Sequence, residues 1–385
     1  MSAATAYKIT HCRACGGRLG DTALIRYANM PCGAQNFPTP EELASDFPLE
    51  LELMECPCCG VAQLTNKPVS YWRQVIRAVG FSNEMISFRL GQFESFVRRH
   101  KLEDKRGIEV GCGDGSYLEV LSRTGLKACG LEYSPRNIKA CKRKNLEVQR
   151  GFARNEAEFA GGPFDAFFVF SYLEHVPGLR DFLGTIRANL KAGAVGLIEV
   201  PNFDMILRKK LFAEFIVDHL FYFTAETLAR TLENNGFRVL SCEPVWHDYI
   251  LSAEVNLRTP LALSALREER EKVEERFGAF LQKYGRVAVW GAGHQSFTML
   301  SMLPGTAKIS YIVDSAGFKQ GRYSPVTHIE VVAPQTLHEE PVDALLIMAG
   351  SYSDEIADIA WKQYGQKNIA IFRDNVIEAY APDGQ

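Results

Sequence analysis

Three kinds of segment are missing from this chain of 385 residues, and each absence excludes a class of protein. No apolar run approaches the roughly 18 residues of a membrane-spanning helix, and the N-terminus lacks the pattern of a secretory signal. The net charge is only −3 and no long basic block occurs, so the sequence predicts no nucleic-acid partner. No long heptad pattern demands a dimer. We therefore expect a cytoplasmic monomer that binds neither a membrane nor nucleic acid.

The composition is that of an ordinary globular protein. Hydrophobic residues make up 46% and charged residues 23%, and the length suits two or three domains. Ten cysteines without a secretion signal predict a reducing compartment, where thiols bind metals or lie in cores rather than form disulfides.

Four of the cysteines form two CxxC pairs, Cys12 and Cys15 in HCRACGG and Cys56 and Cys59 in ECPCCG. Each CxxC turn can hold two sulfur atoms about 3.5 to 4 Å apart, and two such turns supply the tetrahedral set of a structural zinc site. Cys58 lies inside the second pair and is taken as a bystander. Buried or redox-active thiols are the alternative. A four-sulfur site has no open position for substrate, so the predicted zinc is structural.

The middle of the chain alternates strand and helix patterns. Apolar residues at helical spacing over 70–101 predict an amphipathic helical lead-in. Short β-rich runs then alternate with helices that we expect to be capped by Ser116 and Ser134. The expected strands are 106–110, 126–133, 146–151, 165–170 and 191–202, and the expected helices are 116–125 and 134–145. This alternation predicts an α/β fold with a doubly wound parallel sheet.

The loop GCGDG, residues 111–115, connects the first of these strands to a helix. Its glycines let the backbone turn sharply and approach a ligand, and the following helix presents unpaired amides. The loop alone suits NAD, FAD or S-adenosylmethionine. Two acids narrow the choice: Glu109 precedes the loop, and Glu132 ends the second strand, where a carboxylate can bind ribose hydroxyls.

The strings EVGCGDG and, about twenty residues on, LEYS resemble motifs I and II of class I S-adenosylmethionine methyltransferases. A NAD-type fold is the main alternative. The resemblance implies a cofactor site formed by Glu109, Gly111, Gly113, Asp114, Gly115, Glu132, Tyr133 and Ser171.

The last third of the chain restarts with a second strand and glycine turn. A charged helical linker, residues 267–285, precedes RVAVWGAGHQS and KISYIVDSAGFKQGRYSPVTHIEV, which predict a second Rossmann-like α/β unit. Taken alone, GAGHQS with Asp314 after the next strand would suggest NAD.

Four strings together resemble one family, the sugar C-methyltransferases that act on nucleotide-linked 4-keto-deoxysugars. They are PLELELMECPCCGVAQL, HVPGLRDFL, DHLFYFTAETL and VDSAGFKQGRYSPVTHI, and they extend over nearly the whole chain. The resemblance implies a zinc-binding domain (1–69), an S-adenosylmethionine-dependent methyltransferase domain (70–258) and a C-terminal Rossmann-like domain (259–385). The C-terminal domain is expected to hold a nucleotide sugar and no dinucleotide.

Methylating a carbon beside a ketone requires a base that removes a C–H proton, and histidine suits this task near neutral pH. By the resemblance, His219 matches the family's base, Asp218 its acidic partner, and His175 in EHVP another active-site histidine. Each histidine could instead be an ordinary core residue. The expected substrate contacts are Tyr222, Asn202, Lys319, Arg322 and His328.

The chain departs from the family at several of these positions. Ile216 stands where the family has a tyrosine implicated in handling the enolate, and Val217 where it has a histidine. The family's tyrosine after the zinc segment has no clear counterpart, because Phe81 is the nearby aromatic residue and Tyr71 lies upstream.

The C-terminal domain departs from the family as well. Gln295 replaces a lysine, and Gly350 and Ser351 replace a Trp-Asn pair. We therefore expect methyl transfer to a carbon of a nucleotide-linked ketodeoxysugar, with O-methylation of a sugar or small metabolite as the alternative. A zinc-ribbon RNA methyltransferase and a non-catalytic binding module are more distant alternatives.

Overall fold

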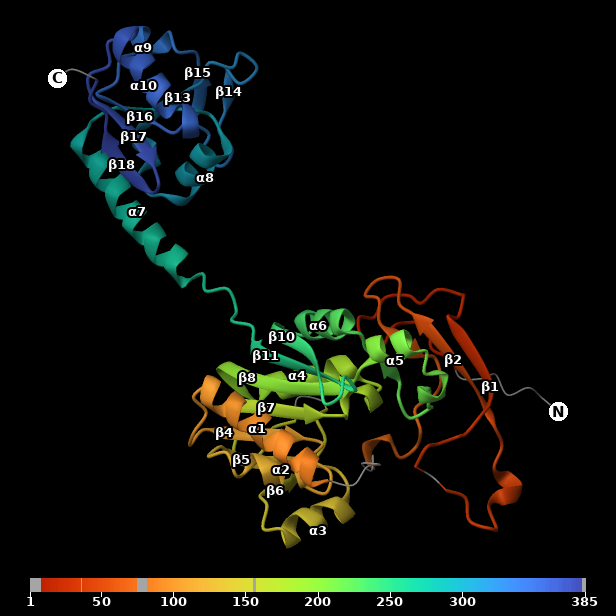
Figure 1. Ribbon diagram of the computed structural model, residues 1–385. Helices are drawn as coiled ribbons and strands as arrows, with labels where there is room; N and C mark the ends of the chain where they lie inside the picture. The colour runs from red at the N-terminus through yellow and green to blue at the C-terminus, as the bar shows by residue number, and fades with distance from the viewer. Residues whose placement is uncertain (1–7, 36, 75–81, 155–156, 383–385) are drawn as a thin grey trace. The chain divides into compact units, whose positions relative to one another are not determined.

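The computed structural model describes residues 8–35, 37–74, 82–154 and 157–382 (Figure 1). The chain divides into two compact units, Met1–Thr259 and Pro260–Gln385. The boundaries of the three domains expected from the sequence stay a prediction.

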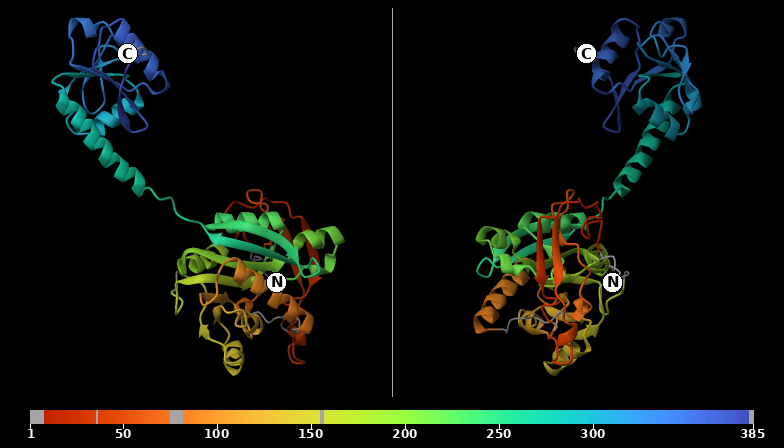
Figure 2. Two further views of the ribbon diagram at one scale, coloured as in Figure 1. Left: turned by 60° about the vertical axis from the view of Figure 1, so that its left-hand side comes forward. Right: turned by 90° about the vertical axis from the view of Figure 1, so that its right-hand side faces the viewer.

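The first sheet belongs to the N-terminal segment that contains both CxxC pairs, which we call the cysteine-rich segment. One of its strands comes from much later in the chain. Its strands run in the order β1-β2-β3-β9, and every neighbouring pair is antiparallel. The two long red strands lie side by side in Figure 2. These strands are β1 (Ile25–Met30), β2 (Leu49–Glu55), β3 (Ala62–Leu64) and β9 (Phe221–Tyr222). The pairing of β3 with β9 joins the cysteine-rich segment to the chain just after His219.

The second sheet has seven strands in the order β10-β11-β8-β7-β4-β5-β6. Neighbouring strands are parallel except at β11, which is antiparallel to both β8 and β10. Its strands are β4 (Arg106–Val110), β5 (Lys127–Glu132), β6 (Val148–Arg150), β7 (Phe164–Phe170), β8 (Leu190–Pro201), β10 (Phe237–Val245) and β11 (Ile250–Leu257). The strand order reverses between β4 and β7, and ligands of open α/β sheets bind at such a switch point.

Helices cover both faces of this sheet. Successive side chains of each strand point to opposite faces, so the apolar strands present apolar side chains on both faces, which the helices bury. On one face Phe168 and Phe170 pack with α1 and α2, and on the other Phe167 and Val169 pack with α4 and α6. The helices of this unit are α1 (Asn83–Arg99), α2 (Ser116–Leu121), α3 (Pro135–Arg143), α4 (Leu179–Ala188), α5 (Phe203–Lys209) and α6 (Ala225–Asn234).

A buried ion pair anchors α1 to the sheet. Arg89 of α1 and Glu199 of β8 have side chains with no exposed surface, and a guanidinium nitrogen lies 2.5 Å from a carboxylate oxygen. The Glu199 carboxylate also accepts hydrogen bonds from Gln92 and Ser252. Removing one partner of such a pair leaves an uncompensated buried charge, so the pair fixes the position of α1.

The strands and helices expected around the glycine loop form within a few residues of their expected bounds, but neither serine caps its helix as expected. Ser116 lies inside α2, and the cap position belongs to Gly115, which has the positive φ (+80°) that glycine adopts without strain. Ser134 does occupy the cap position of α3, but its side chain makes no capping hydrogen bond. Of the expected lead-in helix, residues 75–81 lie outside the described residues.

The second unit contains a seven-stranded sheet in the order β14-β15-β13-β12-β16-β17-β18, with antiparallel strands at both edges. Its strands are β12 (Val287–Trp290), β13 (Ile309–Val313), β14 (Arg322–Tyr323), β15 (Glu330–Val332), β16 (Ala344–Ile347), β17 (Ile369–Arg373) and β18 (Val376–Ala379). Its helices are α7 (Ser264–Lys283), α8 (His294–Met302), α9 (Thr336–Glu339) and α10 (Ser353–Lys362).

The charged segment expected to be a linker is mostly helix α7, and it packs on this second sheet. Its Phe277 and Leu281 are buried in one core with Val289 and Leu346. One face of α7 therefore belongs to the core of the second unit. The many charged residues on its other faces made the segment look like a linker in the sequence.

Candidate active site

The two CxxC turns meet in the first unit. The sulfur atoms of Cys12, Cys15, Cys56 and Cys59 all lie within 4.8 Å of one another. The Cys12 and Cys59 sulfurs are 3.7 Å apart, and those of Cys15 and Cys56 are 3.6 Å apart. The edge of a tetrahedron of sulfurs bound at about 2.3 Å to one ion is about 3.8 Å, so the set fits zinc.

Backbone hydrogen bonds shape both turns in the same way. The amide of Gly16 donates to the Cys12 carbonyl and the amide of Gly60 to the Cys56 carbonyl, each at 2.8 Å. Both glycines have a positive φ, +79° and +77°. Gln63 donates a further hydrogen bond to the Cys12 sulfur at 3.0 Å. Donors aimed at sulfur stabilise the thiolate form that binds a metal.

The glycine loop follows β4 at the switch point of the second sheet. Glu132, at the end of β5, is 5% exposed, and its carboxylate accepts hydrogen bonds from the amides of Gly113 (2.9 Å) and Ser134 (2.7 Å). Burial raises the pKa of Glu132 against these hydrogen bonds. The carboxylate therefore holds the loop in shape and lies where a cofactor ribose would be bound.

Gly111 and Glu109 have little space around them. A Cβ atom at Gly111 would lie 2.9 Å from the Tyr172 ring, and the φ of Gly111 is +77°. Glu109 is buried inside β4. Both residues shape the end of the strand.

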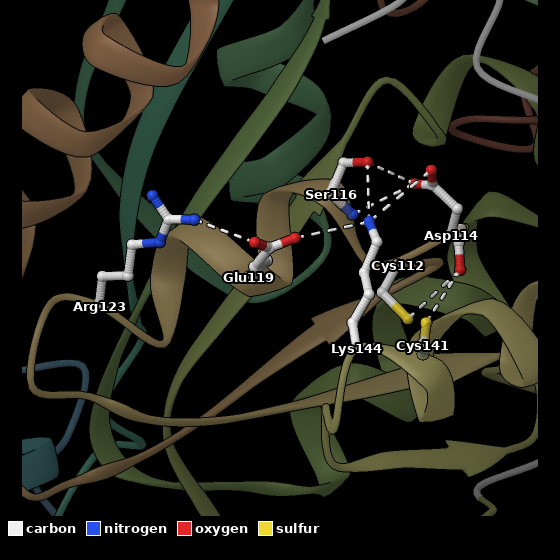
Figure 3. Close-up of polar contacts among 8 residues, drawn as sticks. Cys112, Asp114, Ser116, Glu119, Arg123, Cys141 and Lys144 are labelled. Atoms are coloured by element: carbon white, nitrogen blue, oxygen red, sulfur yellow. Dashed lines mark hydrogen bonds and ion pairs between the residues drawn. The ribbon is translucent and has the colours of Figure 1, made fainter. Parts of the chain in front are cut away.

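Asp114 lies in an exposed polar network at the start of α2 (Figure 3). Its carboxylate accepts hydrogen bonds from the amide and hydroxyl of Ser116, and Lys144 lies 4.0 Å away. In the same view the sulfur atoms of Cys112 and Cys141 point at one oxygen, the Gly113 carbonyl. The loop is thus supported from both sides, and a cofactor contact by Asp114 stays a prediction.

Tyr133 follows β5 and Ser171 follows β7, the two strands that flank β4 in the sheet. Tyr133 lines a small cavity together with Gly111, Phe152 and Tyr172. Ser171 follows β7, has a φ of +46°, and its amide donates to the Glu199 carbonyl. The ends of β4 to β7 thus meet at one place, as a cofactor site at the switch point requires.

His175 and His219 lie together. Their ring centroids are 4.8 Å apart with the planes at 73°. Nδ1 of His175 lies 2.8 Å from the backbone carbonyl oxygen of Asp218, and because a carbonyl can only accept, Nδ1 carries the proton. Nε2 of His175 therefore holds a lone pair, 3.8 Å from Glu174.

Burial sets the protonation of these groups. It lowers the pKa of His175 to about 4 and raises the pKa of Glu174 to about 8. Burial, followed by the neighbouring His175, holds the pKa of His219 well below its usual range. His175 is 4% exposed, whereas His219 is partly exposed. His219 is therefore a neutral imidazole that a ligand can reach.

The Asp218 carboxylate does not bond to the His219 ring in the described structure. Its Oδ2 accepts a hydrogen bond from the amide of Ala34 at 2.8 Å. Burial, followed by a hydrogen bond and the negative charge of Asp218, raises the pKa of Tyr71 to about 12. Asp218 thus connects the histidines, through its carbonyl, to the cysteine-rich segment, through its carboxylate.

Tyr71 is the residue that the sequence reasoning passed over. Tyr71 was not assigned to the site because it lies upstream of the position at which the family has its tyrosine. Phe81, the aromatic residue near that position, lies outside the described residues. The signal that could have found it is the run of two aromatic residues, Tyr71 and Trp72, a few residues after β3 ends at Leu64.

A cavity of about 700 Å³ lies beside this group of residues. It is lined by residues from 29–48 and by 215–217, and thus includes Ile216, Val217 and Ala34. Most of the lining side chains are apolar, with Glu42 and Asp46 as the acids. This volume is typical of a small-molecule site.

Two of the expected substrate contacts have hydrogen-bond partners within the chain. Tyr222 is buried, and its hydroxyl accepts from the amide of Ile216 and donates to the carbonyl of the same residue. Asn202 is 2% exposed, caps α5 through the Met205 amide, and donates to Asp248. Tyr222 thus holds Ile216, which lines the cavity, whereas Asn202 holds the start of α5.

The other three expected contacts belong to the second unit. Lys319 forms an ion pair with Asp314 at 2.8 Å, and the amide of Ala292 also donates to that carboxylate. Arg322 and His328 are exposed. Asp314, the acid that would suit a dinucleotide ribose, is thus engaged by the chain itself.

Comparisons with known proteins match two parts of the chain. Residues 73–242 match the family model described as a methyltransferase domain, and residues 253–372 match the C-methyltransferase C-terminal domain. The C-methyltransferase NovU of Streptomyces niveus is 22% identical over 285 residues, which cover 65% of this chain and 68% of NovU.

Two further likenesses cover smaller shares of the chain. A ubiquinone biosynthesis O-methyltransferase of Methylobacterium sp. (strain 4-46) is 28% identical over 177 residues, 39% of this chain and 70% of that enzyme. The crystal structure of an S-adenosylmethionine-dependent methyltransferase from Clostridium acetobutylicum is 11% identical with a TM-score of 0.39, covering 47% of this chain and 94% of that one.

The chain is an S-adenosylmethionine-dependent methyltransferase. The presence of both matched domains and the likeness to NovU support its assignment to the C-methyltransferases. Among the described residues, no helix combines the length and apolar character needed to cross a bilayer.

Proposed function

We propose that this methyltransferase adds a methyl group to a carbon beside a ketone in a nucleotide-linked deoxysugar. The observations that carry this proposal are the neutral, partly exposed imidazole of His219 and the cavity of about 700 Å³ that the nearby residues Ile216 and Val217 line. The sulfonium of S-adenosylmethionine supplies the methyl group. The protein then has to position the acceptor carbon, remove its proton and stabilise the resulting enolate.

His219 is the proposed base, because a neutral imidazole can accept the C–H proton. Asp218 is the proposed positioning residue: its carbonyl fixes the tautomer of His175, and its carboxylate binds the Ala34 amide at the cavity wall. His175 packs edge-on against His219 and limits the directions in which that ring can turn. Orientation of the base by neighbouring groups is what general-base catalysis requires.

The cavity is the proposed site of the sugar ring. Its described lining contains no Lys or Arg, so it is suited to an uncharged, deoxygenated ring rather than to a diphosphate. We propose that Tyr222 and Asn202 support the cavity, and a substrate contact by Lys319, Arg322 or His328 of the second unit stays a prediction. Gln295 and Gly350, which depart from the family, belong to the same unit.

Ile216 favours a second candidate function, O-methylation of a sugar or small metabolite. Its side chain lines the cavity where the family has a tyrosine, and it has no proton to donate to an enolate. Transfer to a hydroxyl requires a base but no enolate stabilisation, and His219 could serve that reaction unchanged.

Hydrogen exchange separates the two reactions. The protein is incubated in deuterated water with a 4-keto-deoxysugar nucleotide and S-adenosylhomocysteine, so that no methyl transfer follows. If the protein methylates carbon, one ring hydrogen beside the ketone should exchange for deuterium. NMR of the sugar nucleotide measures this exchange. Methyl transfer from S-adenosylmethionine to the same sugar without exchange supports the oxygen acceptor.

We propose one structural zinc ion at the four cysteines and no catalytic role for it, since all four ligands would be protein sulfurs. We also propose a reducing cytoplasm, in which the ten cysteines stay thiols or bind metal. A monomer, with no nucleic-acid or membrane partner, stays a prediction, and light scattering of the purified chain tests its oligomeric state.

A further inference from the structure

A second group of metal-ligating side chains lies away from the cysteines. One donor atom each of Glu174, His175 and His219 lies within 4.8 Å of the other two. Donors bound at about 2.0 to 2.2 Å to one ion lie at most about 4.4 Å apart. Small side-chain rotations would therefore bring the three donors to one ion.

His175 is already oriented as a ligand. Its Nδ1 proton is donated to the Asp218 carbonyl, which aims the Nε2 lone pair toward Glu174. A histidine that binds a metal usually donates its other ring proton to a carbonyl or carboxylate in this way. The Asp218 carbonyl is thus a supporting partner beyond the three donors.

Glu174 has an unsatisfied oxygen in the described structure. The residue is 1% exposed, and its buried Oε2 has no hydrogen-bond partner among the described residues. Its other oxygen faces the lone pair of His175 at 3.8 Å. Two acceptors that face each other in a buried site are stabilised by a positive group between them, which can be a proton on the carboxyl group or a cation that replaces it.

The backbone holds these donors in place. Glu174 and His175 lie in one 3₁₀ turn, Leu173–His175, and the Glu174 carbonyl accepts the amide of Leu220 at 2.8 Å. His219 is the donor that solvent reaches. The site is therefore built from two segments joined by hydrogen bonds, with one face open.

We propose that Glu174, His175 and His219 form a binding site for a first-row divalent cation such as Mn²⁺ or Zn²⁺. Two imidazoles and one carboxylate suit these ions and leave coordination positions open. An imidazole whose lone pair is given to a metal cannot accept a proton. The consequence for turnover, which rests on the proposed function, is that cation binding and the base role of His219 exclude each other, so the ion inhibits methyl transfer.

Manganese binding tests the site directly. Mn²⁺ has little affinity for thiolates, so the cysteine site does not compete for it. The zinc-loaded full chain is titrated with Mn²⁺, and free Mn²⁺ is followed by electron paramagnetic resonance. We expect one Mn²⁺ per chain, with affinity at least tenfold weaker in His219→Ala and in Glu174→Gln.

His247→Ala is the matched control, because this exposed histidine lies outside the cluster and pairs with Glu84 alone among carboxylates of the described structure. Its Mn²⁺ affinity should equal that of the wild type. Absence of a Mn²⁺ site in the wild type, or unchanged affinity in His219→Ala, overturns the proposal.

Turnover at rising Mn²⁺ separates the site from the proposed reaction. We expect activity to fall in parallel with Mn²⁺ occupancy while S-adenosylmethionine binding, measured by calorimetry, stays constant. Occupancy of the site with increased turnover would leave the cation site standing and overturn the base role of His219.

Discussion

The backbone carbonyl of Asp218 accepts the ring proton of His175 at 2.8 Å, although the two residues are 43 positions apart. Two further hydrogen bonds continue this connection: Leu220 donates to the Glu174 carbonyl, and Leu64 of β3 donates to the Leu220 carbonyl. The cysteine-rich segment, the histidine turn and the base-bearing segment are thus held together by backbone contacts. The base of the proposed reaction is oriented by the fold.

Replacing His219 tests the base assignment. His219→Ala removes the proton acceptor and should lower kcat about 10²- to 10⁴-fold. Because His219 is partly exposed, the variant should remain folded and bind S-adenosylmethionine as the wild type does. Single-turnover kinetics with calorimetry measure both properties, and His247→Ala is the control. Wild-type turnover in His219→Ala would assign the proton to another group.

The cysteine site is tested by its metal content. Cys56→Ser should remove the single zinc ion and lower the melting temperature, because a structural zinc site contributes folding free energy. Cys58→Ser is the matched control: Cys58 is exposed, lies outside the four-sulfur cluster, and should leave one zinc per chain. Atomic absorption of the purified chains measures the zinc. Equal loss of zinc in both variants would contradict the four-ligand assignment.

The same zinc ion should influence the active site. Because β3 pairs with β9 directly after His219, loss of order in the cysteine-rich segment should displace that histidine. We therefore expect Cys56→Ser to lower turnover more than it lowers S-adenosylmethionine affinity. A variant that has lost zinc but turns over normally would contradict this connection.

Local patterns made much of this predictable. The spacing of the cysteines and the glycines of 111–115 each require a particular backbone shape, so short strings specify their surroundings. The strands and helices around the loop likewise follow from periodicity. Contacts across the fold are different: the Ala34 amide meets Asp218 across 184 positions, and Arg89 meets Glu199 across the sheet. No local pattern encodes such pairings.

The misplaced details have physical causes as well. Serine is a residue type that often caps helices, but Gly115, with its positive φ, occupies the cap position of α2. The Ser116 hydroxyl donates a hydrogen bond to Asp114 instead. The acid before His219 was expected to pair with its ring. In the structure the Asp218 carboxylate faces Ala34 and Tyr71. Its backbone carbonyl, not its carboxylate, contacts a histidine ring, that of His175.

Glu132 should govern cofactor affinity. Glu132→Gln keeps the shape but removes the charge that holds the Gly113 amide and that we propose to bind the ribose hydroxyls. Hydrogen bonds to a charged group contribute about 1.5 to 3 kcal/mol, so S-adenosylmethionine affinity should fall roughly 10- to 100-fold. Glu147→Gln, an exposed change at the neighbouring strand, is the control. Calorimetric titration measures both, and equal affinities would remove Glu132 from the cofactor site.

The second unit should lose stability in acid through Asp314. Hydrogen bonds from Lys319 and two backbone amides outweigh burial and hold the pKa of Asp314 below its ordinary value of 3.8. The ionised group therefore stabilises the fold above about pH 4, and this contribution is lost as the pH falls through the lowered pKa. Asp314→Asn should be less stable than the wild type at pH 7, and the difference should shrink toward pH 3. Scanning calorimetry measures it, and a difference that grows in acid would contradict the assignment.

The position of the transferred methyl group tests the central claim most directly. The protein is given S-adenosylmethionine labelled with ¹³C in its methyl group together with a 4-keto-deoxysugar nucleotide, and the product is examined by carbon NMR. We predict a methyl signal bonded to a ring carbon beside the ketone. A methyl signal bonded to oxygen would contradict carbon methylation.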